Sequence, residues 1–140
     1  MSTFNYGAPG LGHVGSYQVS GKPFATGSIT APASGSTTVK VKFPSVTRWV
    51  KVIAITGSSS THLRVGFSDN GVKNGNYFRI LAGNNFNHET VSPERMEMKV
   101  SELYFMGDDT ATVEFDVVAG LTGIPTGSIL NNWSGSAGVG

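Results

Sequence analysis

The chain has 140 residues, a length that predicts one domain. Charged residues make up 14% of it and the formal net charge is +1, so no strong field would attract nucleic acid or an anionic membrane. It contains no cysteine, which excludes disulfides, thiolate metal sites and cysteine nucleophiles. No apolar run approaches the roughly 18 residues that cross a membrane. We therefore expect neither nucleic acid nor a membrane as a partner.

Residues 1–36 are predicted to form an N-terminal arm that includes the first short strands. The glycines of residues 10–15 have the G-x-G-x-x-G spacing of dinucleotide-binding proteins. That motif requires a buried strand before the first glycine and a helix after the third. Pro9 directly precedes the first glycine, and Tyr17 and Val19 alternate with polar residues at strand spacing. We interpret the stretch as a flexible glycine-rich segment and not as a nucleotide site.

Residues 37–120 are predicted to form the body of the domain, because apolar and polar side chains alternate along several short stretches. Turn-forming residues separate these stretches, and the two Asn-Gly pairs in residues 69–76 predict a hairpin turn. About seven or eight strands with no convincing helical period indicate an all-β fold. We expect an antiparallel β-sandwich or barrel with extended Gly/Ser-rich N- and C-terminal arms. The predicted strands lie within residues 37–43, 47–55, 62–68, 77–81, 95–100, 102–107 and 111–120.

The same alternation predicts which side chains face the interior of the domain. The expected inward set is Val39, Val41, Phe43, Leu63, Val65, Phe67, Met96, Met98, Val100, Val113, Phe115 and Val117. Acidic residues of the predicted strands are expected on the outward face, where charge is solvated; these are Glu97, Glu102, Glu114 and Asp116.

The sequence offers no catalytic or metal-binding constellation. The histidines at positions 13, 62 and 88 lie far apart and lack the i, i+2 spacing by which one strand supplies two metal ligands. The outward acids give no reason to expect a catalytic carboxylate pair. The Gly-x-Ser-x-Gly element of serine hydrolases is absent. We therefore expect no catalytic residues, no metal and no cofactor, and hence no enzyme.

Large apolar side chains distinguish both ends of the chain from ordinary linkers. Residues 121–140 are predicted to form a C-terminal arm. Its apolar residues include Ile124, Ile129 and Trp133. Such segments become ordered when their apolar residues enter grooves on a neighbour or on their own sandwich. The alternative is that both ends are frayed. The N-terminal arm carries Phe4, Tyr6, Leu11, Val14 and Tyr17. The partner-binding anchors are predicted to be Leu11, Val14, Tyr17 and Trp133.

Three stretches of the sequence resemble a small virion structural protein of tailed phages that infect marine cyanobacteria. They are "FNYGAPGLGHVGSYQVSGKPF" at the start, "RVGFSDNGV" in the middle, and "AGLTGI" followed by "NNWSGSAGVG" at the end. The resemblance implies a multi-copy, β-rich component of the phage particle, such as a capsid decoration protein. Its implied partners are the major capsid protein or other virion proteins, with the protein itself a homo-oligomer.

The implied location is the head surface of the virion. The N-terminus lacks the basic start and apolar stretch of a signal peptide, so we expect synthesis in the host cytoplasm. For the same reason we interpret the glycosylation sequon of residues 132–134 as accidental. The alternative function is a carbohydrate-binding or receptor-binding β-sandwich module on the virion. In that case Trp49 and Tyr77 would be exposed and would stack on sugar rings.

Overall fold

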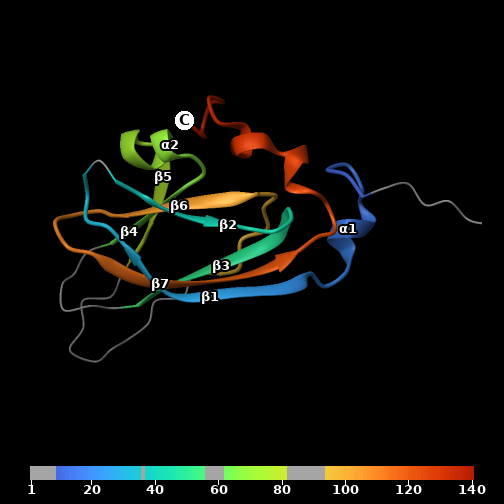
Figure 1. Ribbon diagram of the computed structural model, residues 1–140, viewed down its shortest axis with the longest axis horizontal. Helices are drawn as coiled ribbons and strands as arrows, with labels where there is room; N and C mark the ends of the chain where they lie inside the picture. Colours follow the sequence, from blue (N-terminus) through green and yellow to red (C-terminus); the bar gives the residue numbers. More distant parts are fainter. Residues whose placement is uncertain (1–8, 36, 56–61, 82–93) are drawn as a thin grey trace, which may run out of the picture.

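The computed structural model describes residues 9–35, 37–55, 62–81 and 94–140 (Figure 1). Within these residues, seven strands form two antiparallel sheets that lie face to face, which confirms the predicted all-β fold and shows it to be a sandwich. One sheet has three strands in the order β1-β7-β3, and the other has four in the order β2-β6-β4-β5. The strands are β1 (Lys22–Ala31), β2 (Val39–Lys42), β3 (Thr47–Ile55), β4 (Leu63–Gly66), β5 (Tyr77–Ile80), β6 (Glu102–Gly107) and β7 (Val113–Leu121).

The helices of the described residues are all short. They are α1 (Gly15–Gln18), α2 (Asp69–Asn74) and the 3₁₀-helices η1 (Thr126–Ser128) and η2 (Leu130–Trp133). Strand β1 lies in the sequence range of the predicted N-terminal arm, yet it belongs to the three-stranded sheet and pairs with β7 on both sides of an irregularity between Thr26 and Ile29. This part of the predicted arm therefore belongs to the body of the sandwich.

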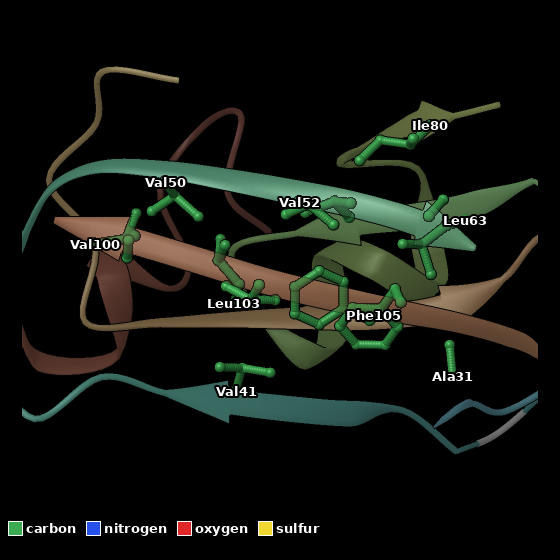
Figure 2. Packing of buried hydrophobic residues seen from close by; sticks show 14 of the residues in the cluster. Ala31, Val41, Val50, Val52, Leu63, Ile80, Val100, Leu103 and Phe105 are labelled. Carbon is green, nitrogen blue, oxygen red and sulfur yellow. The ribbon is translucent and has the colours of Figure 1, made fainter. Parts of the chain in front are cut away.

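The core lies between the two sheets and follows the predicted alternation. Phe105 of β6 and Phe115 of β7 stack across it with ring centroids 4.2 Å apart, which joins the two sheets at their centres. Figure 2 shows Val50 and Val52 of β3 in the same cluster as Phe105. Every residue of the predicted inward set is buried or half-buried, and all belong to or pack against this cluster. Alternating side chains therefore account for the main core.

The hairpin predicted over residues 69–76 contains a helix in place of a tight turn. Strands β4 and β5 do pair antiparallel, but α2 fills the connection between them. Ser68 caps this helix, since its Oγ accepts a hydrogen bond of 2.9 Å from the Gly71 amide. Gly75 ends it with a left-handed φ of 111°. The prediction of a tight Asn-Gly turn was wrong because a serine cap and a terminal glycine stabilise one helical turn here.

The strand predicted over residues 95–100 is not a regular strand. Met96 makes an isolated bridge to Val50, with two backbone hydrogen bonds of 2.8 and 2.9 Å. Further along, the Val100 amide donates to the Thr47 side-chain oxygen at 3.0 Å. The alternation still places Val100 in the core. The inward side was thus predicted correctly, but a threonine side chain substitutes for part of the backbone ladder.

Candidate functional site: the groove beside the C-terminal arm

The C-terminal arm folds back along its own sandwich. After β7 the chain passes through η1 and η2, and its last residues lie beside α2 (Figure 1). Ile124 and Ile129 are buried with Val46 in a second, smaller core. Leu11 and Tyr17, two of the predicted anchors, pack against this second core. The roots of both arms are therefore fastened to one end of the sandwich.

Asn132 clamps the C-terminal arm to strand β6. Its side chain is only 1% exposed, and its Oδ1 accepts hydrogen bonds from the Ser101 amide at 2.8 Å and the Ser101 hydroxyl at 3.0 Å. Its Nδ2 donates to the carbonyls of Phe67 and Glu102. Both the oxygen and the nitrogen of the side-chain amide therefore have hydrogen-bond partners in the sandwich. Since the same nitrogen would have to carry a sugar, this burial blocks the sequon at Asn132 in the folded protein.

A groove, which we call the C-terminal groove, runs between the arm and the sandwich; its main hollow is mainly apolar and its second hollow is more polar. Its main hollow has a volume of about 360 Å³ and is lined by Phe67, Met98, Lys99, Val100, Asn132, Trp133 and Val139. A second hollow of about 300 Å³ adjoins it on the other side of the shared residue Phe67. The second hollow is lined by Phe67, Gly75, Asn76, Tyr77, Phe78 and Gly138. Together they form a two-part concavity beside the C-terminal arm.

Trp133 stands at the rim of this groove with 48% of its surface exposed. Its φ is 58°, in the left-handed region that a bulky side chain rarely adopts. The preceding residue, Asn132, is also left-handed at 49°. Such backbone conformations cost on the order of 1 kcal/mol or more each and persist only where the surroundings enforce them. Here the buried amide of Asn132 enforces the conformation that displays the tryptophan.

Lys99 connects the groove to the N-terminal arm. Its ammonium donates to the Leu11 carbonyl at 2.8 Å and lies 4.3 Å from the centre of the Tyr17 ring. Val14, between these two residues, points away from the body with 65% of its surface exposed. Of the four predicted anchors, Leu11 and Tyr17 therefore contact their own sandwich, whereas Val14 and Trp133 face outward.

The two aromatic residues of the predicted sugar platform lie on opposite faces of the molecule. Trp49 points outward from the three-stranded sheet, because its neighbours Val50 and Val52 point into the core. Tyr77 points outward from the four-stranded sheet, because Phe78 packs against the core. One binding site therefore cannot contain both rings.

The surroundings of each ring also limit stacking on a sugar. The Trp49 ring lies against Gly120 so closely that an added Cβ would be 2.3 Å from the indole nitrogen. The Arg95 guanidinium lies 5.6 Å from the centre of the Trp49 ring. At Tyr77, the guanidinium of Arg64 lies 4.5 Å from the ring centre and that of Arg79 lies 5.6 Å away.

Among the predicted outward acids, Glu102 is buried, at 7% exposure, and is not solvated as expected. It lies on β6, an interior strand of its sheet, and accepts a hydrogen bond of 2.9 Å from the Tyr104 hydroxyl. Lys40 on the neighbouring strand lies 3.6 Å from its other oxygen. Burial, followed by the bond to Glu102, raises the pKa of Tyr104 to about 12. These contacts make Glu102 part of a structural polar network.

Several charged side chains of the described residues form ion pairs. Asp108 pairs with Arg64 at 2.5 Å and with Arg79 at 3.0 Å. Within residues 9–35, 37–55, 62–81 and 94–140, no three His, Asp or Glu side chains are grouped so that they could hold a metal. His88 lies outside the described residues. In the same part of the chain, no helix has the length and apolar character that crossing a membrane requires.

Sequence reasoning identified Trp133 but missed the groove beside it. Asn132 holds the arm that forms one side of this groove, and the available signal was the tolerance of asparagine for left-handed backbone in a glycine-rich stretch. Phe67 and Met98 were assigned to the core, and each lines the groove as well as packing against the core. Their second role depends on where the C-terminal arm lies.

No protein-family model matches the chain, and no curated protein matches it. The fold defines the protein as an antiparallel β-sandwich with sheets of three and four strands. Its candidate functional surface is the C-terminal groove with the exposed Trp133 at the rim.

Proposed function

We propose that the protein is a non-enzymatic structural component of a phage virion, a head decoration or cement protein that stabilises the capsid through subunit contacts. The observation that carries this proposal is the location of exposed apolar side chains. The four large apolar residues with high exposure in the described part of the chain are Val14, Val19, Leu81 and Trp133. Three of these four lie on the arms, where burial against another subunit would remove them from water.

The fold supports a mechanical role for the arms. Their roots are held by the second core and by Asn132, so an incoming subunit meets side chains that are already positioned. Preorganised contacts lose less conformational entropy on binding than free chain ends do. Each bound copy would stabilise the assembled shell by mass action, and many copies together would compensate for a modest affinity per copy. We propose the major capsid protein, other virion proteins and further copies of this chain as partners.

The composition is consistent with this role. Only 14% of the residues are charged, which is below the roughly 25% of ordinary soluble domains. A surface with few charges and displayed apolar residues is suited to being covered in use. The sequence also resembles a virion protein of cyanophages, and from this resemblance we propose that the assembly is the head of a tailed phage.

The test is binding to virions of the phage that encodes the protein. The double variant Val14→Ser/Trp133→Ser should bind at least about tenfold more weakly than the wild type to phage heads from which this protein has been removed. The reason is that burying each large side chain contributes about 1.5–3 kcal/mol. Leu81→Ser is the matched control, because Leu81 is 59% exposed but lies outside the arms. Co-sedimentation measures the bound fraction. Equal binding of the double variant and the control, or absence of the protein from purified virions, would contradict the proposal.

A further inference from the structure

We propose that the C-terminal groove binds residues 1–8 of a neighbouring copy of this chain, with Phe4 and Tyr6 seated in its two hollows. The inference rests on the proposed function, in which the protein acts through contacts between subunits. It adds the identity of one contact: the N-terminal end of one copy against the C-terminal arm of the next.

The chemistry of the groove favours an uncharged occupant. Among the described residues that line the two hollows, Lys99 is the only charged one. Its ammonium already interacts with the Leu11 carbonyl and the Tyr17 ring. A charged ligand would lose its hydration there with little in return, whereas aromatic side chains would gain from burial. Residues 1–8, "MSTFNYGA", contain no charged side chain and two aromatic ones.

The spacing of the two aromatic residues fits the division of the groove. Phe67 lines both the main hollow of about 360 Å³ and the second hollow of about 300 Å³. In an extended chain, residues two apart point to the same side and lie roughly 6.5–7 Å from each other. Phe4 and Tyr6 have this separation in sequence, so both can point into the groove with Asn5 facing away from it. The three small residues Ser2, Gly7 and Ala8 leave room for close approach.

The backbone at the wall of the groove has a feature that is common at ligand-binding sites. Trp133 adopts a left-handed φ of 58°, which is unfavourable for a bulky residue, and 48% of its surface stays exposed. Full burial of the side chain in its own chain therefore does not offset the cost of this backbone conformation. Residues held in such conformations cluster at ligand clamps and other functional sites. Aromatic residues at the rim of a pocket are also the side chains that dominate protein interfaces.

The described start of the chain favours a neighbour's segment over the chain's own. Pro9 lies beside Gly123, since a Cβ added there would be 3.8 Å from the proline ring. The second hollow is lined by Gly75 and Asn76, next to the end of α2, and Figure 1 shows α1 and α2 toward opposite ends of the molecule. To fill both hollows, a chain's own residues 1–8 would have to extend from Pro9, beside Gly123, past the main hollow to the end of α2. The same segment of a second copy is not tied to Pro9 of this chain and can enter the groove from outside.

Complementation between two variants tests this arrangement. The first variant, Phe4→Ser/Tyr6→Ser, lacks the proposed ligand but keeps the groove. The second, Val139→Glu, keeps the N-terminal segment but places a charge in the groove; Trp133→Ala serves if Val139→Glu does not fold. Sedimentation equilibrium at about 100 μM should show association of the wild type, monomers for each variant alone, and a heterodimer in the equimolar mixture. Thermal unfolding of each variant confirms that it is folded.

A second measurement uses a peptide with the sequence of residues 1–8. It should shift the fluorescence of Trp133 in the Phe4→Ser/Tyr6→Ser protein, and a peptide with serine at both aromatic positions should bind at least tenfold more weakly. A monomeric wild type, together with no response to the peptide, would overturn the inference. A different result would also overturn the inference. If the wild type is monomeric, its Trp133 fluorescence is quenched at every concentration, and the two variants form no heterodimer, then the chain's own residues 1–8 occupy the groove. Virion binding of Val14→Ser/Trp133→Ser is measured separately, so failure here is distinguishable from failure of the proposed function.

Discussion

Single residues decide where the C-terminal arm lies. The Asn132 side chain receives two hydrogen bonds from Ser101 and donates to two carbonyls. Asparagine also tolerates the left-handed backbone better than most residues. The same residue therefore supplies both the contacts of the clamp and the direction in which the chain continues to Trp133.

Replacing Asn132 should release the arm without unfolding the sandwich core. Asn132→Ala leaves the Ser101 amide and two carbonyls without partners, and we expect a loss of about 2–4 kcal/mol in the free energy of unfolding. Urea denaturation followed by fluorescence measures the loss. Asn132→Gly is the control, because glycine keeps the left-handed φ but not the hydrogen bonds. If both variants are as stable as the wild type, the clamp does not hold the arm.

Among the secondary-structure elements, strand β6 shows how a sheet turns a predicted surface residue into a buried one. Glu102 alternates outward as the pattern predicts, but β2 and β4 flank its strand on both sides. Tyr104 and Lys40 then enclose its carboxylate. The orientation could be predicted from alternation, whereas the burial depended on strand order, which alternation does not contain.

The raised pKa of Tyr104 predicts a loss of stability in strong base. The phenol stays protonated in the folded protein up to about pH 12, while in the unfolded chain it ionises near its ordinary pKa of 10. The stabilisation is thus fully present below pH 10 and is lost as the pH rises toward 12. Tyr104→Phe should therefore show a shallower decline in the free energy of unfolding over that interval. Parallel curves for the two proteins would show that this hydroxyl does not titrate differently on folding.

At helix α2, the local sequence signal for a tight turn was outweighed by signals for a helix. Residues 69–76 contain two Asn-Gly pairs that favour a tight turn. Ser68 and Gly75 supply the start and stop signals of a helix at the same place. The Ser68 hydroxyl also donates to the carbonyls of Val139 and Gly140 at 2.9 and 2.8 Å, a contact some 70 residues away in sequence. That long-range contact adds to the stability of the capped helix.

At the scale of the whole molecule, the sandwich and the arms carry different tasks. The sandwich has its own core, centred on the Phe105–Phe115 stack between the sheets. The second core of Val46, Ile124 and Ile129 is smaller and lies beneath the arm roots. Stability should therefore come mainly from the first core, and contacts with other subunits from the arms.

Removing the start of the chain should test this division. Deletion of residues 1–16 removes Leu11 from the second core and should lower the free energy of unfolding by less than about 2 kcal/mol. Phe105→Ala, by comparison, should cost about 3–5 kcal/mol because it leaves a cavity between the sheets. Circular dichroism during thermal unfolding measures both. A deletion variant that fails to fold would show that the N-terminal arm is part of the essential core.

The sequence by itself determined the fold class, the inward face of each strand and the apolar character of both arms, because side-chain alternation and composition are local properties. Tertiary structure decided which of the predicted anchors are displayed: Leu11 and Tyr17 pack on the second core, while Val14 and Trp133 remain exposed. It also placed Trp49 and Tyr77 on opposite faces and created the C-terminal groove. These features depend on sheet order and on long-range hydrogen bonds such as those of Asn132, which join residues that no local pattern relates.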